Sequence, residues 1–111
     1  MAIGYNTNVD KVDIRQETGQ ANGSEVMFQL SPNRMYAVEC IETGGGAASA
    51  TLKTRLAGGA KPTDFSNMAA IERGAQTASF SEIIFGASWV GLDIANSSGG
   101  TWTVTVYELK A

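Results

Sequence analysis

Ile83 to Leu109 reads IIFGASWVGLDIANSSGGTWTVTVYEL, and this stretch decides the fold. It contains two runs in which apolar residues alternate, which is typical of strands because successive side chains point to opposite faces. The residues expected to face a core are Val90, Leu92, Ile94, Trp102, Val104 and Val106. Residues 95–100 between the two runs supply the Asn, Ser and Gly that a hairpin loop needs. The stretch predicts a C-terminal β-hairpin in an all-β scaffold.

Four further runs upstream have the pattern of strands: 25–30, 34–42, 49–57 and 76–85. The second is fairly apolar on both faces, which indicates a central strand. The third alternates cleanly, as in a half-buried strand with one face in water. The glycines between the second and third runs predict another hairpin.

Two places interrupt this regular pattern. In the run 76–85 the alternation slips near Glu82, because Ile83, Ile84 and Phe85 are contiguous. A β-bulge or a corner between two sheets would explain the slip. Residues 65–73 fit either a short helix capped by Asp64 or an extended segment. The β-rich surroundings favour the extended segment.

The N-terminal residues 1–24 are polar and differ in composition from the rest of the chain. Their apolar residues are too few to form a core and include Tyr5, Val9, Val12 and Ile14. The segment is either an edge strand around Val12 to Gln16 or an extended arm that orders on a partner. An arm could also add a strand to the sheet of a neighbouring subunit. We therefore divide the chain into an arm, 1–24, and a β domain, 25–111.

The length of 111 residues suits one domain, and the 43% of hydrophobic residues suffices for a core. About seven short strands separated by Gly-rich turns have the rhythm of sandwiches and barrels. We expect an antiparallel β-sandwich, of jelly-roll type, with an extended N-terminal arm. A small barrel is the alternative.

The sequence offers little catalytic chemistry. It has no histidine, which removes the commonest general base and zinc ligand. The acidic residues have no special spacing, so we predict no enzyme, no cofactor and no metal site. The net charge is −3 and the eight Lys and Arg are scattered, so nucleic acid and membrane surfaces are not expected partners. No apolar run approaches the roughly 18 residues of a membrane span. Cys40, the single cysteine, is expected to be buried and unreactive.

The C-terminal sequence resembles the ending of many small virion proteins of tailed phages. The resemblance rests on Ile83-Ile-Phe85, Trp89-Val-Gly-Leu-Asp-Ile94, a Ser/Gly loop and Thr101-Trp-Thr-Val-Thr-Val-Tyr107. These proteins include capsid decoration (cement) proteins and fibre-associated β-sandwiches. The resemblance implies a homo-oligomer, with a trimer favoured, that binds the major capsid protein or another virion protein. It implies location in the virion after assembly in the host cytoplasm, with the N-terminal arm gripping the shell.

Two functions follow as expectations. The first is a non-enzymatic capsid decoration protein whose partner contacts include Tyr5, Val9, Val12, Ile14 and Trp89. The second is a glycan- or receptor-binding module of a tail fibre that uses Trp89 with the loops 43–49 and 95–100. By its phase, Trp89 lies on the face opposite Val90, where a partly exposed ring would suit a partner or a ligand, although core packing remains open.

Overall fold

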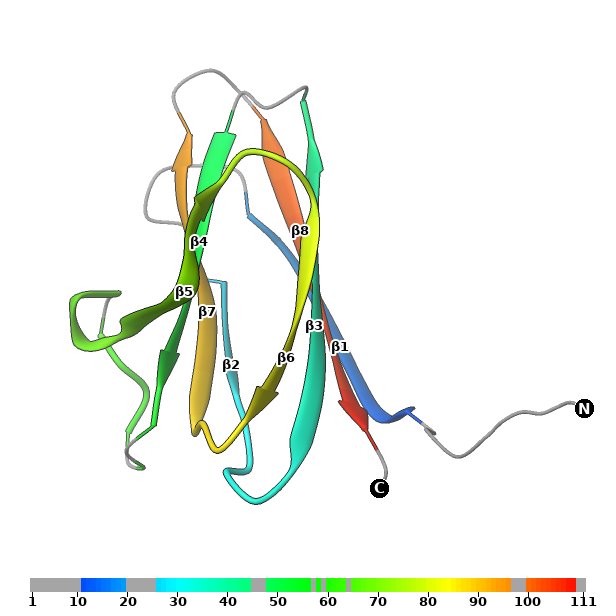
Figure 1. The fold of residues 1–111 in the computed structure, drawn as a ribbon, viewed down its shortest axis with the longest axis vertical. Coiled ribbons are helices and arrows are strands. Elements are labelled where there is room, and N and C mark those ends of the chain that lie inside the picture. Colours follow the sequence, from blue (N-terminus) through cyan, green and yellow to red (C-terminus); the bar gives the residue numbers. More distant parts are fainter. Residues whose placement is uncertain are drawn as a thin grey trace, which may run out of the picture.

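The computed structural model describes residues 11–19, 26–44, 48–56, 58, 60–63, 65–96 and 100–109. These residues form two packed antiparallel sheets, as expected for a β-sandwich (Figure 1). The strands are β1 (Lys11–Gly19), β2 (Val26–Gln29), β3 (Met35–Thr43), β4 (Ala48–Arg55), β5 (Ala69–Gln76), β6 (Phe80–Phe85), β7 (Trp89–Asn96) and β8 (Thr101–Leu109). A 3-10 turn, η1 (Phe65–Asn67), precedes β5.

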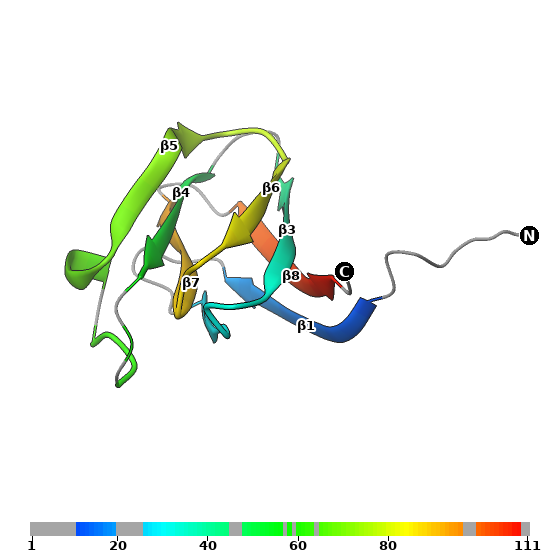
Figure 2. The same ribbon diagram turned by 60° about the horizontal axis from the view of Figure 1, so that its bottom comes forward.

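The strand order is that of a jelly roll. One sheet has the order β1-β8-β3-β6 and the other β2-β7-β4-β5, so consecutive strands mostly alternate between sheets. Figure 2 shows the two layers, and the main cluster of buried residues is drawn from both of them. The jelly-roll sandwich is confirmed, and its eight strands exceed the number expected from the sequence.

Both predicted hairpins are wrong. β7 and β8 lie in opposite sheets, where β7 pairs with β2 and β4, and β8 pairs with β1 and β3. The same holds for β3 and β4. The loops after β3 and β7 therefore cross between sheets, and a Gly-rich loop alone does not distinguish such a crossing from a tight hairpin. Gly44 fits such a crossing, because it has φ +131° and a Cβ there would stand 2.8 Å from Cα of Gly100.

The predicted core residues of β7 and β8 are buried. Val90, Leu92, Ile94, Trp102, Val104 and Val106 are each at most 1% exposed. Trp102 packs edge-on against Phe80, with ring centroids 5.8 Å apart. β3 is central in its sheet, between β8 and β6, as expected, and contributes Tyr36, Val38 and the buried thiol of Cys40 to the core. Leu56, which the alternation of 49–57 places inside, is instead 68% exposed beyond the end of β4.

The structure defines three segments whose secondary structure the sequence left ambiguous. Residues 65–73 contain both the turn η1 and the start of β5. β6 pairs with β3 from Met35↔Phe85 to Cys40↔Phe80 without a register shift, so neither of the two explanations for the slip near Glu82, a bulge or a corner between sheets, is correct. At the N-terminus, Lys11–Gly19 is a strand that pairs with β8 at the sheet edge, which realises the edge-strand alternative.

Candidate interaction surface

The outward face of the β1-β8-β3-β6 sheet has two apolar rows at one end. Backbone pairing aligns Leu109, Met35 and Phe85 across β8, β3 and β6. The next row on the same face aligns Tyr107, Ala37 and Ile83. We call these six residues the outer apolar face.

The outer apolar face is open to solvent. Met35 is 44% exposed, Ile83 60% and Phe85 65%, whereas Ile84 between the last two is buried at 6%. The contiguous apolar residues Ile83 to Phe85 thus mark an edge strand that is apolar on both sides. Clustered exposure of large apolar side chains is typical of a protein interaction site.

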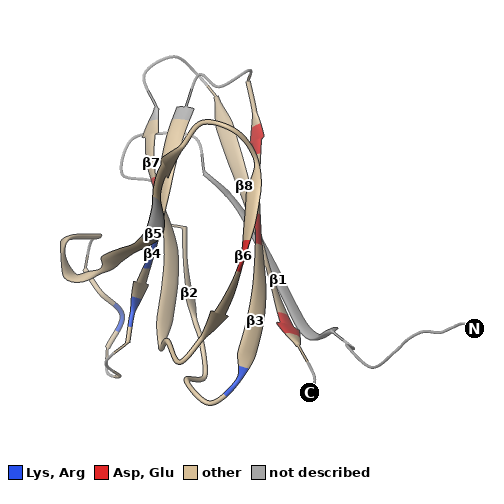
Figure 3. Cartoon of the chain, in the orientation of Figure 1, with Lys and Arg blue, Asp and Glu red and all other residues tan. Residues whose placement is uncertain are grey.

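The charges of this sheet are mostly acidic. On β3, β6 and β8 the charged residues are Glu39, Glu42, Glu82 and Glu108 (Figure 3). Glu108 forms an ion pair with Arg34, with Nη1 2.6 Å from Oε2, at the end of the sheet where the outer apolar face lies. Of these four, only Glu39 has the outward phase of Met35 and Ala37. The other three glutamates have the phase of the buried residues of their strands, so the outer apolar face is largely uncharged.

The outward face of the other sheet is different, because part of the chain covers it. Phe65 and Met68, from η1 and the residue after it, pack on Met27 and Trp89 in a small cluster in which each residue is 8% exposed. Gly91 leaves room for this cover, since a Cβ there would stand 2.9 Å from Cε1 of Phe65. Nearby, Lys53 and Asp93 form an ion pair with Nζ 2.9 Å from Oδ2.

Of the five predicted contact residues, the structure describes three, and these lie in two different strands. Tyr5 and Val9 lie outside the described residues. Ile14 pairs with Tyr107 of the outer apolar face, and Val12 lies at the register shift between Lys11 and Asp13. Trp89 is on the predicted side of β7 but is buried beneath Phe65 and Met68. Its Nε1 is buried and has no hydrogen-bond acceptor among the described residues.

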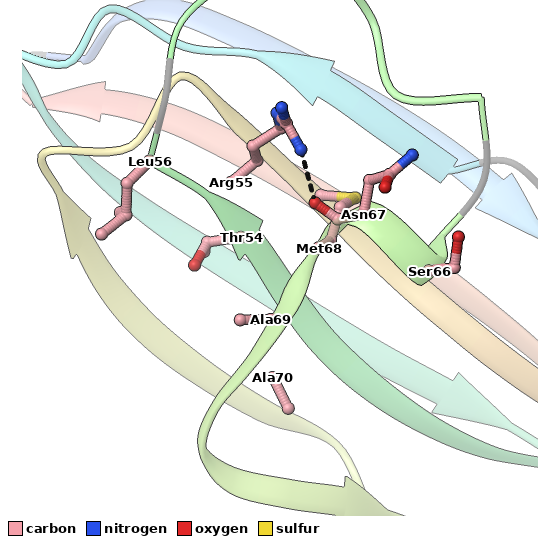
Figure 4. A pocket seen from close by; sticks show the side chains of 8 residues that line it. All are labelled: Thr54, Arg55, Leu56, Ser66, Asn67, Met68, Ala69 and Ala70. Carbon is pink, nitrogen blue, oxygen red and sulfur yellow. Dashed lines mark hydrogen bonds between the residues drawn. The ribbon is translucent and has the colours of Figure 1, made fainter.

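Two shallow pockets lie near the exposed end of β4. The first is lined by Thr54, Arg55, Leu56 and residues 66–70 (Figure 4). Arg55 Nη1 donates a hydrogen bond of 2.8 Å to the backbone oxygen of Asn67, so the guanidinium holds η1 against β4. The lining contains no carboxylate that could pair with a general acid or base.

The second pocket opens between the sheets beside β6. It is lined by Thr54 and by the apolar residues Leu56, Ile71, Ile83, Ile84, Phe85 and Ala87. Ile83 and Phe85 therefore belong both to this pocket and to the outer apolar face.

Within the described residues no group of three or more His, Cys, Asp or Glu side chains could hold a metal ion. No helix among them is long and apolar enough to cross a membrane.

The outer apolar face was not singled out from the sequence. Two signals could have found it: the apolar second face of β3, with Met35 and Ala37, and the contiguous Ile83, Ile84 and Phe85. The first was interpreted as the mark of a central strand and the second as a β-bulge or a corner between two sheets, because the sequence does not show which strand lies at an edge.

Comparison with known proteins gives only remote similarities. No family model matches the chain, and no curated protein matches it. Among solved structures, a periplasmic inhibitor of g-type lysozyme from Aeromonas hydrophila is 13% identical, with a TM-score of 0.48, covering 86% of this chain and 85% of that chain. A Bacillus endospore appendage protein that forms disulfide-linked pili is 16% identical, with a TM-score of 0.40, covering 99% and 100%.

A third structure, IMPa from Pseudomonas aeruginosa in complex with an O-glycopeptide, is 12% identical, with a TM-score of 0.43. The match covers 91% of this chain and 13% of that chain. Similarities of this size define neither a family nor a function for the chain.

Proposed function

We propose that this chain is a non-enzymatic structural protein of a virion, a capsid decoration protein that binds the shell as a homo-oligomer, with a trimer favoured. The observation that supports the proposal best is the outer apolar face. A protein that clamps subunits together needs surface that gains free energy when it is covered. The large exposed apolar side chains of the outer apolar face suit this task.

The free energy gained by covering the outer apolar face can be estimated from the exposed fractions of its side chains. Full burial of a large apolar side chain contributes about 1.5–3 kcal/mol. Met35, Ile83 and Phe85 are 44%, 60% and 65% exposed. Covering what remains exposed of these three would therefore contribute roughly 2.5–5 kcal/mol.

That gain reaches only the lower end of the free energy that association costs, about 4–15 kcal/mol for lost translation and rotation. One copy bound through this face alone would dissociate readily. Several linked copies convert later contacts into intramolecular ones, which raises the overall affinity without new contacts. This is the physical reason for proposing an oligomer on a repeating surface.

The test uses capsids assembled without this chain, to which purified protein is added before sedimentation. We expect the wild type to cosediment and to raise the temperature at which the capsids open. A variant with Ile83→Ser and Phe85→Ser should lose both effects while keeping its fold. Leu56→Ser is the matched control, because Leu56 is 68% exposed yet lies off the outer apolar face. Wild-type protein that neither sediments with the capsids nor stabilises them would refute the proposal.

A glycan- or receptor-binding module remains the second candidate from the sequence. Its aromatic platform would be Trp89, which is 8% exposed. No observation in the described residues favours this function, and the proposal therefore rests on the outer apolar face.

A further inference from the structure

The two sheets end in four edge strands, β1 and β6 in one sheet and β2 and β5 in the other. An edge strand presents unpaired backbone groups that can pair with another chain, and proteins usually protect such edges with charges, bulges or short strands. The four edges differ sharply in this respect.

Three of these edges have a recognised form of protection. β1 has a charged residue at every second position from Lys11 to Glu17, and a register shift near its start. β2 is only four residues long. β5 is interrupted, because the pairs Thr51↔Ala75 and Lys53↔Ala70 leave residues 71–74 opposite the single position between Thr51 and Lys53.

β6 lacks these forms of protection. It has six residues, FSEIIF, in unbroken register with β3. It contains neither Lys nor Pro, and its one charged residue is the half-buried Glu82. Its outward residues Ile83 and Phe85 are 60% and 65% exposed. An edge that is regular, strongly β-forming and apolar on its outward side is expected to pair with another strand.

We propose that the free edge of β6 pairs antiparallel with β6 of a second copy of this chain, around a two-fold axis. The inference goes beyond the proposed function and does not depend on a capsid. An isologous contact needs a surface that complements itself. β6 meets this need because its outward residues are the uncharged Ser81 and the apolar Ile83 and Phe85, and its only charge lies on the opposite side.

The side-chain alternation fixes the register of this pairing. Residues opposite each other in an antiparallel pair point to the same face, so odd positions must meet odd positions if the outer apolar faces of two copies are to join. Two such registers keep five residues of β6 paired. One puts Glu82 opposite Glu82 of the second copy, and directly opposed like charges are unfavourable. The other puts Ile83 opposite Ile83, Ser81 opposite Phe85, and Glu82 opposite Ile84, and this is the register we assign.

The contact would join two four-stranded sheets into one of eight strands. It would be smaller than the roughly 1,200–2,000 Å² of total buried area that stable interfaces have. We therefore expect a dimer that dissociates on dilution. A trimer that also uses this contact would form pairs of trimers, since a two-fold contact cannot by itself close a trimer.

Cysteine cross-linking tests the register directly. Ile83→Cys should form a disulfide-linked dimer under mild oxidation, because the two introduced cysteines face each other. Ser81→Cys alone should not, but a mixture of Ser81→Cys and Phe85→Cys proteins should form the mixed dimer. Leu56→Cys is the matched control for chance collision, since Leu56 is 68% exposed. The native Cys40 is 0% exposed and adds no background in the folded protein.

Sedimentation across a concentration series gives an independent measurement. Ile83→Lys should weaken the dimer at least about fivefold by placing two ammonium groups opposite each other, whereas Leu56→Lys should not change it. Glu82→Gln should strengthen the dimer, because the two carboxylates lie diagonally across the two-fold axis. All these positions except Glu82 are well exposed, so the variants should fold, and near-UV circular dichroism checks this.

Two results would overturn the inference. The first is Ile83→Cys dimer formation no greater than that of Leu56→Cys. The second is self-association that Ile83→Lys leaves unchanged. Neither would bear on capsid binding, so failure of this contact and failure of the proposed function are distinguishable. Capsid binding by oligomers in which Ile83→Cys forms no cross-link above the control would refute the β6 pairing and leave the proposed function standing.

Discussion

Phe65→Ala should uncover Trp89 without unfolding the sandwich. Phe65 belongs to the small cluster with Met27, Met68 and Trp89, outside the main core that both sheets share. Its segment lies on the outward face of the β2-β7-β4-β5 sheet, where Arg55 also holds it through the hydrogen bond to Asn67. Removing the ring therefore weakens a cover and leaves the central packing in place.

The expected loss of unfolding free energy is about 1.4–2.8 kcal/mol, because Phe65 is only 8% exposed and full burial of such a side chain contributes about 1.5–3 kcal/mol. Core Phe→Ala changes cost about 3–5 kcal/mol when a cavity stays open. We expect a smaller cost here, since a surface segment can collapse onto the gap. Loss of the cation–π contact of the Lys53 ammonium, 6.0 Å from the ring centroid, adds a fraction of 1 kcal/mol to this loss of stability.

Tryptophan fluorescence measures the uncovering, and urea unfolding measures the stability. Trp102 is 0% exposed and serves as an internal reference that acrylamide should not quench. Trp89 should become quenchable in Phe65→Ala, with emission shifted to longer wavelength. Leu56→Ala is the control, since Leu56 lines a pocket with Met68 of the covering segment but is already 68% exposed. A folded Phe65→Ala protein with unchanged emission and quenching would refute the reasoning that Phe65 shields Trp89.

Three further predictions concern the same side of the molecule and the core. Gly91→Ala should lower the free energy of unfolding by about 1–3 kcal/mol, since its Cβ would stand 2.9 Å from both Phe65 Cε1 and the backbone oxygen of Val26. Urea unfolding measures this loss, and in the double variant Phe65→Ala should remove part of it. Lys53→Met should lower stability by no more than about 1 kcal/mol, because its ion pair with Asp93 is partly exposed, and the difference from the wild type should shrink in 1 M salt. The thiol of Cys40 should react with Ellman's reagent only after urea unfolds the chain, and rapid reaction in native buffer would contradict its 0% exposure.

Period-two alternation was sufficient to predict the fold class and most of the core. Val90 and Val104 are buried because strands between two layers must turn every second side chain inward. Pairing could not be predicted in the same way. β8 pairs with β1 over Lys11↔Leu109 to Gly19↔Trp102, across almost the whole chain, and no local turn signal encodes that contact.

The candidate surface was hidden from the sequence for a related reason. Whether Ile83 and Phe85 face a core or solvent depends on whether their strand has a layer packed on both sides. β6 is an edge strand of an open face, so its contiguous apolar residues were mistaken for a slip in phase. Trp89 is the opposite case, since its outward position was predicted correctly but the Phe65 segment that covers it comes from 24 residues earlier in the chain.

Both outward faces therefore carry apolar side chains, but the chain itself covers them on only one of the two faces. On the β2-β7-β4-β5 sheet, Met27 and Trp89 would be exposed apolar residues, and the chain covers them with its own Phe65 and Met68. On the β1-β8-β3-β6 sheet, Ile83 and Phe85 stay exposed, and exposing such side chains costs free energy that covering them would recover. A chain that provides a cover on one side and leaves the other apolar is consistent with a cover supplied by a partner. The β6 edge and the outer apolar face meet at these two residues, so substitutions there test both kinds of contact at once.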